Sequence, residues 1–285
     1  MPLFDAYVAV DWSAANRRKT DKDSIWIAAC GSAGDVLRNT PTRDEATLAV
    51  RDLLLTLTSR GERVLVGFDF PYGYPRGFAD RIAPGAGAPW RRTWDALAVR
   101  VEDDARNRSN RFAVAADLNA HVRTFWGCPS SFASSLAATK DRSDELREYR
   151  EVERRLQARG RSAKSAWQLF GRGCVGSQAL LGIPRVRALR DDSQLAAHSA
   201  VWPCETGLRV PEAQVVHAEI WPGALDVDPT AHAVADAAQV LSVVRAWAHR
   251  DARGELAPLF EPPVDDVETR VAIEEEEGWI LGAAA

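Results

Sequence analysis

The order of apolar and polar positions in the first quarter of the chain predicts an α/β layer fold. Three short strands are expected first, at residues 6–11, 24–30 and 35–39. A helix is expected next, because Thr42 and Glu45 form a capping box and apolar residues recur at helical spacing as far as Gly61. The run 64–68 shows no alternation, which is typical of a strand covered on both faces and paired in parallel.

The middle of the chain interrupts this pattern. Residues 73–172 begin as Pro- and Gly-rich loop and continue as mostly helical sequence, so we expect a largely helical insertion. Strand-like runs return after Ser199, and Asp228 and Pro229 are placed to start a helix that reaches about Arg250. The expected organisation is a mixed sheet flanked by helices, with a discontinuous core at 1–72 and 173–250, a basic insertion at 73–172 and an acidic C-terminal tail at 251–285.

Composition narrows the class of protein. An apolar content of 46% in 285 residues is sufficient for a large core. The four cysteines lie far apart in the sequence, which argues against a zinc ribbon or a disulfide scaffold and favours a reducing compartment. The sequence shows neither a basic segment before the first apolar run nor an apolar stretch long enough to cross a membrane. We therefore expect a cytoplasmic protein that makes no use of a membrane.

Charge is divided unevenly along the chain. The formal net charge of −4 argues against a uniformly basic nucleic-acid binder, but residues 73–172 carry 19 Lys and Arg against 12 Asp and Glu. The insertion also interleaves aromatic residues with arginines, namely Trp90, Trp94, Phe125, Trp126 and Trp167 with Arg91, Arg92, Arg123 and Arg172. Such a mixture suits unstacked bases and phosphates, although tryptophans more often fill a core. The acidic run at 274–277 reads as solvated, with Trp279 anchoring the tail.

Two predicted strands each end on a carboxylate. Asp11 ends "VAVD" and Asp69 ends "VGFD". If these strands are parallel neighbours, both side chains emerge at one edge of the sheet, where open α/β folds place their ligand sites. Two close anions repel each other, so a cation between them would favour their charged forms. Each aspartate alone is equally well explained as a turn cap.

A third carboxylate lies on the late helix. Asp236 shares a face with the apolar residues that would dock this helix on the sheet. Glu219, near the end of the strand-like "VVHAEIW", is a candidate fourth, unless an edge strand turns it to solvent. Hard oxygen ligands without a Cys or His cluster point to Mg²⁺ or Mn²⁺ rather than to zinc.

Several motifs together give a resemblance to a known family. "VAVDWSA", "VGFDFPYG", "VGSQALLG", "HAEIWPG" and the Asp-Ala-Ala of "VADAAQVL" are similar in order to the family labelled domain of unknown function 429, described as predicted nucleases with an RNase H-like fold. The resemblance spans about 6–72 and 164–250, and it implies that Asp11 on the first strand, Asp69 on the fourth strand and Asp236 on the final helix are metal ligands. Alanines follow Asp236 where the family pattern would place a second acidic residue, so the number of metal ions stays open.

A glycine-rich loop offers a second candidate site. "GRGCVG" at 171–176 satisfies G-x-G-x-x-G, but it follows helix-like sequence, which argues against a dinucleotide fold. An alternative is an anion-binding corner, in which Ser177 caps a short helix and Lys164 and Arg172 attract a phosphate. A plain glycine turn with solvated basic side chains is equally compatible with the sequence.

These features predict a metal-dependent phosphodiester hydrolase. Asp11, Asp69 and Asp236 would bind Mg²⁺ or Mn²⁺, Glu219 would complete the catalytic set, and the substrate would be nucleic acid or another phosphoester. A nucleic-acid or nucleotide binding module with an incomplete site is one alternative. ATP-dependent phosphotransfer on the actin-like version of the fold is another, although that version usually has a duplicated core. The sequence does not indicate an oligomeric state.

Overall fold

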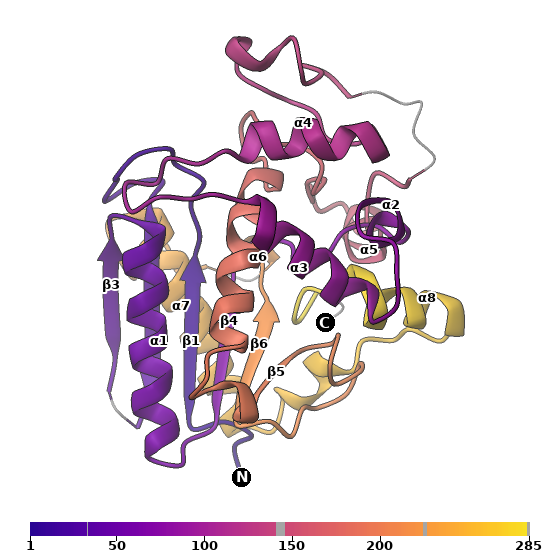
Figure 1. Cartoon of the computed structure of the whole chain (residues 1–285). Coiled ribbons are helices and arrows are strands. Elements are labelled where there is room, and N and C mark those ends of the chain that lie inside the picture. The colour runs from indigo at the N-terminus through magenta and orange to yellow at the C-terminus, as the bar shows by residue number, and fades with distance from the viewer. Residues whose placement is uncertain (33, 141–145, 225–226, 284–285) are drawn as a thin grey trace.

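The computed structural model describes residues 1–32, 34–140, 146–224 and 227–283. These residues contain a six-stranded mixed sheet in the order β3-β2-β1-β4-β6-β5, with helices on both faces (Figure 1). The strands are β1 (Ala6–Asp11), β2 (Ile25–Gly31), β3 (Val36–Thr40), β4 (Val64–Phe68), β5 (Ser199–Val201) and β6 (Val215–Glu219). The α/β class with a mixed sheet flanked by helices is therefore confirmed.

Strand directions place the carboxyl ends of every strand except β2 at one edge of the sheet. β2 is antiparallel to both β1 and β3, whereas β4 is parallel to β1, and β6 is parallel to β4 and to β5. In this register Val10 lies opposite Phe68, and Phe68 lies opposite Glu219. All five residues of β4 are buried, as the unbroken apolar run predicted. The residues that follow β1 and β4 are thus neighbours at this edge.

The helices are α1 (Arg43–Ser59), α2 (Phe78–Ile82), α3 (Pro89–Arg100), α4 (Arg111–Val122), α5 (Glu151–Ala158), α6 (Gly176–Arg190), α7 (Ala235–Ala252) and α8 (Val267–Ala272). Short turns complete them, namely η1 (Ser130–Phe132), η2 (Ala196–His198), η3 (Pro222–Ala224), η4 (Ala257–Phe260) and the π-helical η5 (Ile273–Glu277). Thr42 caps α1 by accepting a hydrogen bond from the backbone N–H of Glu45, 3.2 Å away. None of the helices in the described ranges combines the length and the apolar content needed to cross a bilayer.

The helix predicted from Asp228 begins later than expected. The Asp228 carboxylate accepts bonds from the backbone N–H and the hydroxyl of Thr230, at 2.9 and 2.6 Å, and α7 starts only at Ala235. Asp228 therefore closes a local turn instead of capping a helix, because a short acidic side chain serves both purposes equally well.

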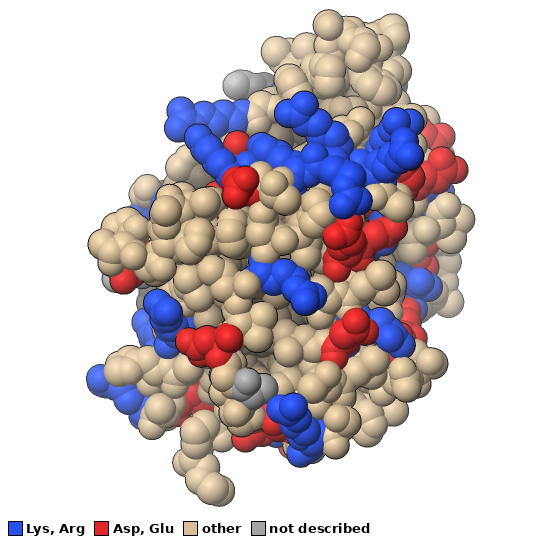
Figure 2. Space-filling view, turned by 90° about the vertical axis from the view of Figure 1, so that its left-hand side faces the viewer, with Lys and Arg blue, Asp and Glu red and all other residues tan. Residues whose placement is uncertain are grey.

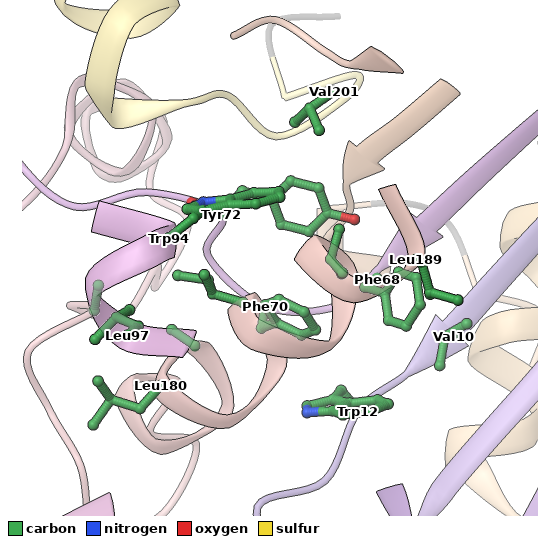
Figure 3. Packing of buried hydrophobic residues seen from close by; sticks show 14 of the residues in the cluster. Val10, Trp12, Phe68, Phe70, Tyr72, Trp94, Leu97, Leu180, Leu189 and Val201 are labelled. Atoms are coloured by element: carbon green, nitrogen blue, oxygen red, sulfur yellow. The ribbon is translucent and has the colours of Figure 1, made fainter. Parts of the chain in front are cut away.

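Two hydrophobic layers enclose the sheet. Figure 1 shows α1 and α6 in front of the strands and α7 behind them. The front layer contains Trp12, Phe68, Phe70, Tyr72 and Trp94, whose rings lie close together in Figure 3. Successive ring centroids in this series are 5.5 to 5.9 Å apart. This aromatic packing holds rigid the segment that follows Asp69.

The insertion shares this core. The rings of Trp90, Trp94, Phe125 and Trp167 are buried, and α3 packs against α6 of the core segment. Most of the aromatic residues that could have stacked on bases therefore fill the interior, which was the alternative interpretation of their pattern. The buried apolar residues of α3 and α4 belong to the same hydrophobic cluster as the sheet, and both helices pack on α6.

The last two glutamates of the acidic C-terminal run are buried and not solvated. The Glu276 carboxylate accepts the backbone N–H groups of Gly77 and Ala79, at 2.8 and 2.7 Å, at the start of α2. The Glu277 carboxylate accepts those of Arg76 and Glu151, at 3.0 and 2.7 Å. Both glutamates are buried, as is Trp279. The tail thus fastens two helices of the insertion. The expectation of a solvated run was wrong for Glu276 and Glu277, whereas Glu275 is exposed.

Candidate functional site

Asp11 and Asp69 lie side by side at the edge of the sheet. The backbone N–H of Asp69 donates to the carbonyl oxygen of Val10 over 3.0 Å, which continues the parallel pairing of β1 and β4 to their ends. Both side chains are half-buried and line a cavity of about 710 Å³. Asp11 and Asp69 therefore lie together, as we expected if their strands were parallel neighbours.

Asp236 reaches the same cavity from α7. It lies in the first turn of the helix, where the N-terminal end of the helix dipole favours a negative charge. Val240, Val243 and Trp247 on the same face are buried against the sheet, as the helical spacing predicted. The Asp236 Oδ2 atom accepts the backbone N–H of Asp23 over 2.5 Å. This bond ties the loop after β1 to the start of α7.

Negative charge predominates in the cavity, which is lined by four aspartates and by Lys19. Burial, together with the nearby charges of Asp69, Asp236 and Asp23, raises the pKa of Asp11 well above its usual range. Burial and the neighbouring Glu219 raise the pKa of Asp69 to about 7. Within the described ranges, neither Asp11 nor Asp69 forms an ion pair with a Lys, Arg or His side chain. A bound cation would relieve this repulsion.

The donor chemistry of the pair fits a hard divalent cation. Among the described residues, no group of three or more His, Cys, Asp or Glu side chains is arranged so that it could hold a metal ion. Mg²⁺, however, is usually held by one or two carboxylates together with water and substrate phosphates. Asp11 and Asp69 lack a cationic partner in the described structure and line one cavity, so a pair of this kind could take part in such an open site.

Glu219 occupies a different environment from the one predicted. Its carboxylate accepts two bonds from the Arg150 guanidinium, 2.7 Å from Nη1 to Oε2 and 2.6 Å from Nη2 to Oε1. Oε2 also accepts the backbone N–H of Tyr72 over 2.9 Å. Glu219 is buried and paired, so its acceptor capacity is used in holding the structure together. We correct its expected role from ligand to buried structural partner.

The structure also differs from the expected anion-binding corner at Ser177. Ser177 does not cap a short helix, because α6 begins at Gly176 and extends for 15 residues. Its hydroxyl donates to the carbonyl oxygen of Leu169 over 2.7 Å and accepts from Arg111 Nε over 3.1 Å, and the residue is buried. Ser177 therefore anchors the glycine loop from inside the protein, where it is not available to an anion.

Lys164 and Arg172 remain exposed beside this loop. Lys164 lines a second cavity of about 230 Å³ that also contains Asp69 and Trp221. Gly171 and Gly173 line the larger cavity with the three aspartates. The glycine loop thus borders the carboxylate cluster, even though its serine does not face it.

The sequence patterns did not identify three residues of the site. Asp23 enters through its backbone N–H, Gln178 donates from Nε2 to the carbonyl oxygen of Trp12 over 2.5 Å, and Phe170 lines the cavity from the glycine loop. Phe170 and Gln178 belong to segments distant from Asp11 and Asp69 in the chain, whereas Asp23 lies in the loop that follows β1. The position of Phe170 directly before "GRG" was the one available hint.

Two loops near the cavity carry exposed basic side chains. The Asn107 Nδ2 atom donates to the carbonyl oxygen of Arg17 over 3.1 Å, so the loop after β1 lies beside the loop before α4. Exposed basic residues of these loops are Arg17, Arg18, Lys22, Arg106 and Arg108. Figure 2 shows Lys and Arg side chains gathered in a band across the upper part of the molecule. These two loops therefore place exposed basic side chains near the acidic cavity, together with acidic residues such as Asp21 and Asp104.

No protein-family model matches the chain. Searches of curated proteins and of solved structures likewise find nothing similar. A functional conclusion must therefore be drawn from the geometry of the site itself.

Proposed function

We propose that this protein is a metal-dependent phosphodiester hydrolase. The observation that carries the proposal is the convergence of Asp11, Asp69 and Asp236, from β1, β4 and α7, in one cavity. Such a gathering of like charges is unfavourable unless a cation or protonation compensates it, and perturbed carboxylates in a cleft mark functional sites more often than chance.

The topology supports an RNase H-like assignment. Three antiparallel strands are followed by the parallel β4 and β6, and helices cover both faces. The acidic residues fall on the first strand, after the fourth strand and on a long late helix, which are the positions implied by the resemblance to the predicted nucleases.

Asp11 and Asp69 would hold the metal ion, and Asp236 would lie in the same cavity. A bound Mg²⁺ or Mn²⁺ supplies Lewis-acid stabilisation and an activated water in reactions of this class. The chain contributes the placement of these groups. The bond from Asp23 N–H orients Asp236, and the parallel register fixes the two strand-end carboxylates relative to each other.

The surroundings of the cavity suit a phosphoester. Arg17, Lys22, Arg106 and Arg108 have no ion-pair partner among the described residues and lie in the two loops beside the site. Basic groups at the rim attract a phosphate backbone, while the carboxylates in the floor require a cation before a phosphate can approach closely. This combination favours a polyanionic substrate over a neutral one.

Cleavage assays test the proposal. Labelled single-stranded and duplex DNA and RNA, together with bis(p-nitrophenyl) phosphate, are incubated with Mg²⁺, Mn²⁺ or EDTA. We expect metal-dependent product, which Asp11→Asn reduces at least about 100-fold. Asp52→Asn, on the exposed surface of α1, serves as the matched control and should keep full activity. A folded Asp11→Asn variant with undiminished metal-dependent turnover would contradict the proposal.

A nucleic-acid binding module is the second candidate. The basic rim and the lack of a closed metal centre among the described residues favour it. Such a protein would bind nucleic acid with affinity that falls steeply with salt, but it would yield no metal-dependent product. Phosphotransfer on the actin-like version of the fold is not proposed, because the described residues form a single sheet with one copy of the core.

A further inference from the structure

Phe170 is an exposed aromatic ring at the mouth of the carboxylate cavity. It is 53% exposed, and the other large apolar residues with comparable exposure in the described ranges are aliphatic. Its neighbours along the wall of the cavity include Asp11, Asp69 and Asp236. A large apolar ring left in water beside a polar site is unfavourable unless a ligand covers it.

The backbone that presents this ring is firmly held. Leu169 N–H donates to the carbonyl oxygen of Trp126 over 2.9 Å, and the carbonyl oxygen of Phe170 accepts from Gln168 Nε2 over 3.2 Å. A side chain added at Gly127 would come within 3.0 Å of that same oxygen, so the two backbones pass close together. The exposure of the ring therefore does not result from a loosely attached loop.

Trp221 provides a second aromatic surface. It is half-buried after β6 and lines both the carboxylate cavity and the adjoining cavity of about 230 Å³. Its position is set by the preceding residue, because Ile220 N–H donates to the carbonyl oxygen of Phe68 over 3.0 Å. Aromatic walls thus accompany the acidic residues in both cavities.

We propose that Phe170 and Trp221 form a stacking site for unpaired bases, so that the substrate class is single-stranded or locally unpaired nucleic acid. This inference rests on the proposed phosphodiester hydrolase. Bases in a duplex cover one another's faces, so a base reaches an aromatic wall only when it is unstacked. A small phosphoester without a base would leave both rings uncovered.

Binding assays with variants of Phe170 test this inference. Fluorescence anisotropy is measured with a labelled oligothymidylate and with a duplex, at one fixed ionic strength and in EDTA, so that the proposed metal-dependent activity does not cleave the strand. We expect Phe170→Ala to weaken single-strand binding about tenfold, and Phe170→Trp to retain it. Val99→Ala, at a residue 86% exposed on α3, is the matched control and should bind like the wild type. Duplex binding should be weaker and insensitive to Phe170→Ala.

The outcomes separate this inference from the proposed function. Phe170→Ala binding single strands as tightly as the wild type, or a wild type that prefers duplex, overturns the stacking site. Metal-dependent cleavage of bis(p-nitrophenyl) phosphate in that case leaves the hydrolase standing. Conversely, Phe170-dependent binding in EDTA without any metal-dependent product supports the stacking site and refutes the hydrolase. Thermal melting of each variant establishes that it is folded.

Discussion

Arg150 and Glu219 form a bidentate ion pair in the interior of the protein. Arg150 lies at the start of α5 in the insertion, and Glu219 ends β6 in the sheet. The guanidinium also donates from Nε to Glu153 Oε1 over 2.9 Å. Both glutamates depend on one buried arginine, which fastens the insertion to the strand beside β4.

Arg150→Ala should destabilise the fold strongly. The variant leaves Glu153 and Glu219 buried without a cation, and such a loss costs about 3–5 kcal/mol of unfolding free energy. Arg154→Ala is the control, because the Arg154 side chain is 52% exposed in its pair with Glu151 and should contribute less than about 1 kcal/mol. Urea unfolding monitored by circular dichroism compares the two. Equal stability losses would contradict the account of the buried pair.

Two adjacent glutamates of the C-terminal run should contribute differently to the stability of the fold. Glu276→Ala removes the acceptor for the backbone N–H groups of Gly77 and Ala79, and we expect a loss of about 1–3 kcal/mol. Glu275→Ala alters an exposed neighbour and should change stability by less than about 0.5 kcal/mol. Thermal unfolding of both variants measures the difference. Equal melting temperatures of the two variants would contradict this account and would indicate that Glu276 is solvated like Glu275.

Local sequence patterns correctly predicted which aspartates meet at one edge of the sheet. β1 and β4 are short apolar runs, and two hairpin-like strands and one crossover helix between them favour a parallel direction, so the neighbouring positions of Asp11 and Asp69 could be expected. The inward placement of Asp236 followed from helical spacing on α7. These inferences needed only periodicity and the rule that parallel strands end together.

Long-range pairing explains what the sequence did not predict. Arg150 and Glu219 are 69 residues apart, and no spacing rule connects them. The acidic run resembled a solvated tail because composition is local, whereas its burial depends on N–H donors about 200 residues away, at Gly77 and Ala79. Ser177 was misassigned for a related reason, since its partner Arg111 comes from a different helix.

Removing the charge of Asp69 should stabilise the metal-free protein at alkaline pH. The pKa of Asp69 in the folded state is about 7, against 3.8 for an ordinary aspartate. Because burial favours the protonated form, this group supports the fold fully below about pH 4, and that support is lost as the pH rises to about 7. Asp69→Asn stays neutral throughout, so it should gain about 2 kcal/mol over the wild type at about pH 8 and almost nothing at about pH 4.

Urea unfolding in EDTA at both pH values measures this effect. Asp52→Asn, at an exposed position of α1, is the control and should show no such pH-dependent gain. An Asp69→Asn variant that is no more stable than the wild type at about pH 8 would show that the charged carboxylate of Asp69 does not destabilise the fold.

Binding of Mn²⁺ tests the central claim, that the strand-end carboxylates form a cation site. Electron paramagnetic resonance measures free Mn²⁺ during titration with the wild type and with Asp11→Asn, a substitution that keeps the shape of the side chain. We expect the wild type to remove Mn²⁺ from solution, Mg²⁺ to compete, and Asp11→Asn to bind at least about tenfold more weakly. A wild type that leaves the Mn²⁺ signal unchanged, or an Asp11→Asn variant with undiminished affinity, would contradict the claim.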